Sequence, residues 1–283
     1  MKILAIGAHQ DDNEFRVGGM TVKWKKAGHE VRFLSLTNGC GGHHLLTPEE
    51  TVKARAKESA EVAAYLGIRY DIWEDQDDCV LVADLATRHR LMRYIREFSP
   101  DVIITHRTND YHADHRAAAL LVQDASYLLT VPHACPDVPA MRKMPVILFY
   151  EDAFTEPPFR MRYVVGIDEE FDAKMHVAHL NKSQVYEWLP YTYGMKLPET
   201  DEEKHTVLWG IDVTSDTTDE EVMKEKRGYA VRFAKTAARF RAELIERYGE
   251  EKGKRIRFAE AFALSEYGSQ PTEELEKALF GIS

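Results

Sequence analysis

Short apolar segments alternate with amphipathic segments from residue 3 to residue 167. Each apolar segment has the length of a strand buried on both faces, and a polar loop or apolar residues at helical spacing follow it. The predicted strands are Ile3–Ala8, His29–Leu36, Tyr70–Trp73, Asp101–Thr105, Pro145–Tyr150 and Tyr163–Ile167. The predicted helices between them are Met20–Ala27, Pro48–Tyr65, Asp84–Phe98 and Arg116–Leu129. This alternation predicts an α/β protein, a three-layer α/β/α Rossmann-like fold with a mostly parallel sheet.

From Asp172 onward the pattern becomes mostly helical. It predicts a helix from Asp172 to Leu189, an irregular stretch from Pro190 to Asp212, and a long helix from Asp219 to Tyr248. The apolar face of the long helix comprises Val222, Tyr229, Phe233, Ala237, Phe240 and Leu244. Its polar face is interpreted as a solvated surface or an oligomer interface. We therefore expect an α/β core over residues 1–190 and a largely helical C-terminal extension over residues 191–283, packed on that core.

The loop after the first predicted strand carries an imidazole and two adjacent carboxylates. His9, Asp11 and Asp12 come where the strand ends, and the glycine pair Gly18-Gly19 then leads into a helix. The loop has no GxGxxG fingerprint, so a nucleotide-binding Rossmann protein is a weak alternative. Imidazole and carboxylate are ligands for Zn²⁺ or Fe²⁺. One such cluster alone is more often a helix cap or a solvated turn.

A second polar cluster follows the fourth predicted strand, where His112, Asp114 and His115 precede a helix. His112 and His115 are three residues apart at the helix start, so both can face one point. In a doubly wound sheet the first and fourth strands are neighbours, which brings their loops together at the switch point. Two such clusters at the ends of two strands favour a metal site over two unrelated caps.

The loop after the second predicted strand contains Gly39, Gly41 and Gly42, followed by His43 and His44. A glycine cluster at a strand end is usually an ordinary turn. Because this loop lies beside that of the first strand, the two histidines are second-choice metal or substrate residues. On the next helix, Arg55 and Glu58 are three residues apart and can simply pair in solvent.

Composition and charge narrow the functional classes. The chain has 283 residues, enough for a large core without disulfides, and its three cysteines are far apart, so we expect a reducing compartment. No apolar run approaches the roughly 18 residues of a membrane span, and no leader peptide is evident. The formal charge of −10 argues against nucleic acid as a partner. We expect a cytoplasmic protein without a membrane partner.

Two motifs resemble those of a known family. The segment from Ala8 to Gly19, AHQDDNEFRVGG, is similar to the AHPDDE motif and following glycine pair of the PIG-L/LmbE family of zinc-dependent N-deacetylases, and HADH, ending at His115, is similar to its HPDH motif. The resemblance extends to Thr37-Asn38-Gly39, Arg55, Glu58, Leu66-Gly67, His179, Ser183-Gln184 and Glu260 to Phe262. Gln10, Asn13 and Arg16 depart from the family pattern. None of them removes an expected ligand, but Arg16 alters the region where substrate would enter.

The resemblance implies roles for individual residues. His9, Asp12 and His115 would bind Zn²⁺, with Fe²⁺ as the alternative, and leave a position open for water. Asp11 would act as general base and then protonate the leaving amine. His112 would stabilise the oxyanion, and Asp114 would orient His112. Arg55, His43, His44, Asn109, Tyr111 and Arg16 are the expected substrate-binding residues, and the part played by Tyr111 or His179 in catalysis is left open.

The resemblance further implies hydrolysis of an acetamide on an N-acetylated amino sugar, glycoconjugate or related small molecule. Two alternatives remain. The first is a metal-dependent amidase that cleaves a conjugate or antibiotic amide, which a test for acetate release would distinguish. The second is a non-catalytic binding protein on a deacetylase scaffold, whose signature would be the loss of Asp11 or of a ligand. The sequence selects neither one substrate nor one oligomeric state, and a homo-oligomer stays open.

Overall fold

A computed structural model of the chain describes residues 1–214 and 216–281. Within these residues, seven strands form one sheet in the order β3-β2-β1-β4-β5-β7-β6. The strands β1 to β5 are parallel, and β7 runs antiparallel to both β5 and β6. Their bounds are β1 (Lys2–Gly7), β2 (Glu30–Ser35), β3 (Arg69–Ile72), β4 (Val102–Thr105), β5 (Val146–Tyr150), β6 (Tyr163–Gly166) and β7 (Ala259–Leu264). The predicted α/β fold with a mostly parallel sheet is confirmed.

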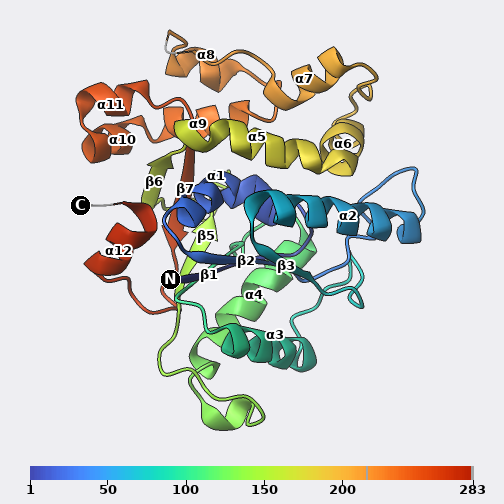
Figure 1. Cartoon of the computed structure of the whole chain (residues 1–283), viewed down its shortest axis with the longest axis vertical. Helices are drawn as coiled ribbons and strands as arrows, with labels where there is room; N and C mark the ends of the chain where they lie inside the picture. The colour runs from blue at the N-terminus through green and yellow to red at the C-terminus, as the bar shows by residue number, and fades with distance from the viewer. Residues whose placement is uncertain (215, 282–283) are drawn as a thin grey trace.

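Helices cover both faces of the sheet (Figure 1). One face carries α1 (Asp12–Lys26), α2 (Pro48–Leu66) and α5 (Phe171–Leu180), and the other carries α3 (Leu85–Phe98) and α4 (Ala113–Leu128). Successive side chains of a strand point to opposite faces. In β1, accordingly, Ile3 and Ala5 belong to one hydrophobic core, whereas Leu4 and Ile6 belong to the other. This explains why β1 is an uninterrupted apolar run.

The central position of β1 in the sheet determines where the loops form a crevice. β1 lies between β2 and β4, so the chain leaves it toward one side of the sheet for β2 and β3 and later returns on the other side for β4 and β5. Loops at the carboxyl ends of strands on either side of such a switch point diverge and leave a crevice. The loops after β1 and β4 therefore meet, as the sequence predicted.

The predicted ends of two helices agree with the structure to within one residue. Thr47 and Glu50 form a reciprocal capping box at the start of α2, and Gly67 ends that helix with a φ of 62°. The Asp84 side chain caps α3 by accepting a hydrogen bond from the Thr87 backbone N–H. Helix α4 begins at Ala113 rather than at Arg116. Its first turn therefore contains part of the second polar cluster.

The helix expected after Gly18-Gly19 instead begins at Asp12 and is kinked at Val17, with φ −129° and ψ 17°. The kink frees backbone N–H groups of Gly19 and Met20, which donate to the Glu260 carboxylate of β7 at 2.9 and 2.8 Å. A Cβ on Gly19 would lie 2.9 Å from Ile167 Cδ1 and 3.0 Å from Glu260 Oε1. The glycine at this position thus permits close packing of α1 on β7.

Glu260 also forms a buried ion pair with Lys174 of α5, with 2.5 Å between Nζ and Oε1 and side chains that are 0% and 1% exposed. We expect Lys174→Met to lower the free energy of unfolding by about 3 to 5 kcal/mol, because it leaves a buried carboxylate without a counter-charge. Chemical denaturation measures this loss, with Lys226→Met as the control because Lys226 is exposed. A loss for Lys174→Met no larger than that of the control would contradict this account.

The C-terminal part differs most from the prediction. The helix expected from Asp172 to Leu189 is α5, followed by a π-helix, η3 (Ser183–Trp188), and by α6 (Leu189–Thr192). The stretch expected to be irregular contains α7 (Asp201–Trp209), whose start is capped by Thr200 and Glu203. The other short elements are the 3-10 helices η1 (Pro132–Ala134) and η2 (Asp168–Glu170), α11 (Glu250–Arg255) and α12 (Glu273–Phe280).

The long helix expected from Asp219 to Tyr248 is three helices, α8 (Asp219–Lys224), α9 (Val231–Arg239) and α10 (Arg241–Tyr248). Gly228 has a φ of +84°, and a Cβ there would lie 2.4 Å from Gly210 Cα, so the two glycines pack closely and the helix breaks. All six predicted apolar positions of this region are nevertheless buried. The predicted apolar face was therefore correct, although the helix is not continuous.

The segment 191–283 was expected to be a largely helical extension, but it also supplies β7, which lies inside the sheet between β5 and β6. The reason is that AEAFAL is short and apolar and pairs with strands distant in sequence. The cysteines Cys40, Cys79 and Cys135 are free. Among the residues that the structure describes, none of the helices combines the length and the apolar character that crossing a membrane requires.

Candidate metal centre and active-site cleft

The loops after β1 and β4 bring the two polar clusters of the sequence together. Ile6 pairs with Thr105 at the ends of these adjacent strands. His9 and Asp12 follow β1 at the start of α1, and His115 lies in the first turn of α4. Two helix N-termini therefore point toward one place at the carboxyl edge of the sheet. This convergence depends on tertiary structure, since about 100 residues separate the clusters.

The three expected ligands are arranged around one point. His9 Nδ1 lies 3.3 Å from His115 Nε2 and 3.6 Å from Asp12 Oδ2, and His115 Nε2 lies 3.2 Å from Asp12 Oδ1. Ligands about 2.0 to 2.1 Å from a tetrahedral metal ion lie about 3.3 Å from one another. The two contacts of Asp12 use different oxygen atoms. Two groups of three side chains whose donor atoms could hold a metal ion overlap here, namely His9, His112 and His115, and Asp12, His106 and His115.

Carboxylates contact the ring nitrogen of each imidazole that is not directed at the expected metal position. His9 Nε2 contacts Asp78 Oδ1 at 2.9 Å and Asp114 Oδ2 at 3.4 Å, and His115 Nδ1 contacts Asp110 Oδ1 at 2.9 Å. Such contacts fix the tautomer and the orientation of a metal-binding histidine. Asp12 and Asp110 also raise the pKa of His115 to about 9, although burial by itself would lower that pKa. The centre thus holds more negative than positive charge and suits a cation.

Asp12 is positioned by its own loop and by a residue that the sequence analysis did not assign. Its Oδ2 accepts a hydrogen bond from the His9 backbone N–H at 2.9 Å and lies 3.1 Å from His106 Nε2. Burial would raise the pKa of Asp12, but the charges of His115 and His106 outweigh it and lower that pKa well below its usual value. Asp12 is therefore held as a carboxylate, the form that binds a metal.

Asp11 differs from its neighbour in direction and in charge state. Its φ is +99°, an unusual value for a residue other than glycine. The carboxylate lies 3.3 Å from Arg55 Nη2. Burial raises the pKa of Asp11 to about 6, against the opposing effect of Arg55. A carboxylate with such a pKa can exchange protons near neutral pH, as a general base must.

His112 is the N-cap residue of α4, and its Nδ1 accepts a hydrogen bond from the Asp114 backbone N–H at 3.1 Å. In the neutral ring the proton is then on Nε2. Burial, followed by the charges of His9 and His115, lowers the pKa of His112 and favours this neutral form. The family resemblance predicted that the Asp114 carboxylate would orient His112. In the structure this carboxylate instead contacts His9 Nε2, and it also accepts hydrogen bonds from the backbone N–H groups of Cys79 and Leu81.

A cleft of about 210 Å³ opens above this centre. Of the expected substrate-binding residues, Arg16, Arg55 and Tyr111 line it, together with Asp11 and His112. Tyr111 is 73% exposed, and its ring lies edge-on to His115 with 5.3 Å between centroids. The other lining residues are His9, Asp12, Phe15, Gly41, Gly42, Asp78, Cys79, His115, Gln184, Trp188, Leu189, Tyr193 and Arg232. The lining thus combines aromatic side chains with polar and charged ones.

Three expected substrate residues lie outside the cleft and stabilise loops. His43 Nδ1 accepts the backbone N–H groups of Leu45 and Leu46, and its Nε2 lies 2.7 Å from Glu187. The His44 ring stacks on Tyr191 with 4.0 Å between centroids. Asn109 Nδ2 donates to the Glu156 carbonyl oxygen at 3.0 Å. Spacing in the sequence cannot distinguish these loop contacts from substrate contacts.

Arg55 and Glu58 are not a solvent-exposed pair. Arg55 is 2% exposed and faces Asp11, whereas Glu58 is 8% exposed and accepts hydrogen bonds from the backbone and the side chain of Ser183. His179 lies on α5 with its Nδ1 2.8 Å from the Tyr186 hydroxyl, and it does not line the cleft. The surface interpretation of Arg55 was therefore wrong.

The sequence analysis assigned no role to Asp78, His106, Asp110 and Arg232. His106 and Asp110 lie between β4 and the second polar cluster, so their place directly after that strand was the available signal. Asp78 follows β3 in the run QDD, which is an ordinary polar loop in the sequence. Arg232 lies on α9, far along the chain, and only the packing of that helix on β7 brings it to the cleft.

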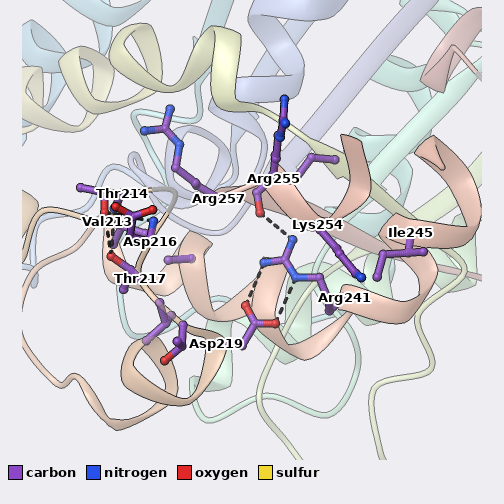
Figure 2. A pocket seen from close by; sticks show the side chains of 14 residues that line it. Val213, Thr214, Asp216, Thr217, Asp219, Arg241, Ile245, Lys254, Arg255 and Arg257 are labelled. Carbon is purple, nitrogen blue, oxygen red and sulfur yellow. Dashed lines mark hydrogen bonds and ion pairs between the residues drawn. The ribbon is translucent and has the colours of Figure 1, made fainter. Parts of the chain in front are cut away.

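Another cavity, of about 340 Å³, lies among α8, α10 and α11 and is lined by several cationic side chains (Figure 2). These cations already have partners. Arg241 binds Asp219 through two nitrogen atoms at 2.9 and 3.0 Å, Lys254 pairs with Glu250, and Arg257 pairs with Asp168. The cavity therefore lacks the uncompensated charge and the converging ligands of the cleft after β1 and β4.

Comparisons with known proteins support this assignment. Residues 4–126 match the family model PIG-L, described as GlcNAc-PI de-N-acetylase, which confirms the resemblance seen in the sequence. The diacetylchitobiose deacetylase of Thermococcus kodakarensis is 26% identical to this chain over 204 residues, which are 67% of this chain and 74% of that protein. The matched family region contains both polar clusters.

Solved structures share the fold along most of the chain. The N,N′-diacetylchitobiose deacetylase of Pyrococcus horikoshii superposes with a TM-score of 0.64 at 20% identity, covering 97% of this chain and 88% of that one. GalB, the 4-carboxy-2-hydroxymuconate hydratase of Pseudomonas putida KT2440, superposes with a TM-score of 0.69 at 18% identity, covering 96% and 98%. At these identities the likeness shows the fold alone.

Proposed function

We propose that this chain, whose residues 4–126 belong to the PIG-L family, is a metal-dependent N-deacetylase that releases acetate from an N-acetylated amino sugar or a related small molecule. The observation that carries the proposal is the arrangement of His9, Asp12 and His115 around one point, with the Asp11 carboxylate beside them and not needed as a ligand. The deacetylase relatives support amide hydrolysis as the reaction class.

His9, Asp12 and His115 are the proposed ligands, and two imidazoles with one carboxylate favour Zn²⁺, with Fe²⁺ as the alternative. Bound there, the ion would supply Lewis-acid polarisation of the amide carbonyl and lower the pKa of a water molecule. Asp78 and Asp110 would keep the two imidazoles oriented through their outer nitrogen atoms. These contacts predefine the site before any substrate binds.

The protein residues around the ligands account for the proton transfers. Asp11 accepts a proton from the attacking water, whose oxygen bonds to the amide carbon, and then gives the proton to the nitrogen as the carbon–nitrogen bond breaks. His112, protonated on Nε2, donates a hydrogen bond to the carbonyl oxygen as its negative charge develops. Donors of this kind typically contribute about 10²- to 10³-fold to the rate. The products are acetate and the free amine.

The lining of the cleft supports a small-molecule substrate with a ring. Tyr111, Trp188 and Tyr193 border the cleft, and such aromatic rings offer flat apolar surfaces to a sugar. The formal charge of −10 gives no support to nucleic acid as a partner. We therefore propose an N-acetyl amino sugar or glycoconjugate as the substrate class.

Arg55 is proposed to act through Asp11. Its positive charge lowers the Asp11 pKa, so Arg55→Ala should raise that pKa and shift the acidic limb of kcat/KM to higher pH, because Asp11 must be deprotonated to act as base. Metal content should stay near that of the wild type. The measurement is a pH–rate profile with metal analysis, and Arg55→Lys, which keeps the charge, should shift the limb less. An unshifted limb in Arg55→Ala would argue against this role.

A further inference from the structure

The cleft above the metal centre continues into a larger cavity. This second cavity has a volume of about 510 Å³ and shares Phe15, Arg16, Tyr111 and Arg232 with the metal cleft. Helix α9 and the loop after β5 form much of its wall, through residues such as Thr236 and Asp152. A substrate with its acetamide at the metal centre therefore has room for a further group in this cavity.

The acidic side chains of the second cavity already have partners. Asp110 binds His115 at 2.9 Å, Asp152 binds Arg107 at 2.5 and 2.7 Å, and Glu260 binds Lys174 at 2.5 Å. Glu151 accepts a hydrogen bond from Thr236 at 2.6 Å and lies 3.5 Å from Arg239. Each acid of this cavity is therefore already paired with a neighbouring side chain.

Three cationic side chains of the same cavity, Arg16, Arg232 and Lys235, form no salt bridge within residues 1–214 and 216–281. Burial raises the pKa of the nearby Glu151, and the charges of Arg239, Arg16 and Arg232 oppose that rise. Arg16 is half-buried, and its Nη1 donates to the Glu151 carbonyl oxygen at 2.7 Å, which satisfies a donor but does not neutralise the charge. The cavity is therefore a positively charged region in a protein whose formal charge is −10.

Arg16 and Arg232 line both cavities. The Arg232 side chain is exposed, and the surrounding protein, followed by the charge of Arg16, lowers the pKa of Arg232. Two neighbouring guanidinium groups without an anion are unfavourable, and an anion between them removes the repulsion. The planar donors of arginine suit a carboxylate in particular.

Charge is distributed unevenly along the combined cleft. Asp11, Asp12 and Asp78 line the metal cleft alone, Arg16 and Arg232 line both cavities, and Lys235 lines the second cavity alone. A substrate that carries a negative group would bind in one direction only, with that group away from the acids. The charge distribution thus selects both the substrate and its orientation.

We propose that Arg16 and Arg232 form a carboxylate-binding subsite, so that the substrate is an N-acetylated amino sugar bearing a carboxylate on the side remote from the acetamide. This inference rests on the proposed deacetylase function.

The test compares two probes of equal length, the carboxymethyl and the 2-hydroxyethyl glycosides of N-acetylglucosamine. Acetate release and direct calorimetric binding are measured for both on the zinc-loaded protein. We expect kcat/KM to be about 10-fold or more higher for the carboxymethyl glycoside, as one or two charge-assisted hydrogen bonds would give. This preference should weaken as salt is added.

Variants assign the preference to the two arginines. In Arg232→Ala and Arg16→Ala the ratio of kcat/KM between the two probes should fall toward one, mainly through KM for the carboxymethyl glycoside. Arg142→Ala is the matched control, because Arg142 is exposed, lies just before β5 at the opposite edge of the sheet, and lines none of these cavities. Its ratio should equal that of the wild type. Thermal unfolding checks that each variant is folded.

The outcomes separate this inference from the proposed function. Equal kcat/KM and equal binding of the two probes, or a preference that survives in both arginine variants, would overturn the carboxylate subsite while leaving the deacetylase intact. No acetate from either probe, with tighter binding of the carboxymethyl glycoside that the arginine variants lose, would overturn the deacetylase and support the subsite. No acetate and no difference in binding would overturn both.

Discussion

The Asp11→Asn variant should retain its metal and lose about 10²- to 10⁴-fold in kcat/KM, the usual contribution of a general base. The reason is that Asp11 and Asp12 are adjacent in sequence but face different groups. Asp12 is one of the three proposed ligands and contacts His115, whereas the Asp11 carboxylate contacts Arg55. Asparagine has almost the same shape as aspartate and cannot accept the proton of the attacking water.

The pH profile makes this prediction sharper. Burial raises the pKa of Asp11 to about 6, so the wild-type kcat/KM should fall as the pH drops through about that value and protonates the base. In Asp11→Asn that acidic limb should flatten. Near-normal turnover in the variant with its metal in place would rule out Asp11 as base, and loss of the metal would mean that ligand and base are assigned the wrong way round.

The Asp12→Ala variant should lose both its metal and its activity. The wild-type protein should contain about one divalent ion per chain, mostly zinc, since its ligand set is two imidazoles and a carboxylate. Removing Asp12 deletes one of three ligands and also frees His106, whose Nε2 lies 3.1 Å from Asp12 Oδ2. Elemental analysis after dialysis should then find little metal in the variant.

Thermal unfolding distinguishes loss of metal from loss of folding. A ligand that binds only the folded state raises Tm, so added zinc should raise Tm of the wild type and not of Asp12→Ala. Asp75→Ala is the matched control, because Asp75 is exposed and its partner is the surface residue Arg90. That variant should keep metal and activity. Full metal binding by Asp12→Ala would remove Asp12 from the ligand set.

The proposed ligands could be found in the sequence because each cluster is local. His9 to Asp12 and His112 to His115 follow short apolar strands, and the switch-point rule for parallel sheets then places the two loops together. The same local patterns predicted the ends of α2 and α3 to within one residue. Periodicity and capping depend on neighbours within a few residues, so one sequence suffices to detect them.

The parts that the sequence did not reveal depend on contacts between distant segments. Asp78 is one carboxylate in a polar loop until the fold places it 2.9 Å from His9. Arg232 sits on an amphipathic helix whose polar face was interpreted as a solvated surface or an oligomer interface, and its place in the cleft follows from packing of α9 on β7. The break at Gly228 likewise depends on Gly210.

Other residues were predicted to bind substrate from the sequence but lie outside the cleft in the structure. His43 follows a glycine-rich loop beside the first polar cluster, and in the sequence it was a reasonable candidate for the substrate site. In the structure its ring nitrogens bind two backbone N–H groups and Glu187, which stabilises the loop. The chemistry of a side chain gives its possible partners, but only the fold selects among them.

The most direct test of the central claim is acetate release by the metal-loaded protein from N-acetylglucosamine derivatives, including N,N′-diacetylchitobiose and the carboxymethyl glycoside. The account predicts equal amounts of acetate and free amine, loss of both after chelation, recovery on addition of zinc, and almost no product from Asp11→Asn. Absence of acetate from every N-acetyl amino sugar tested with the metal in place, or acetate release that survives both chelation and Asp11→Asn, would contradict it.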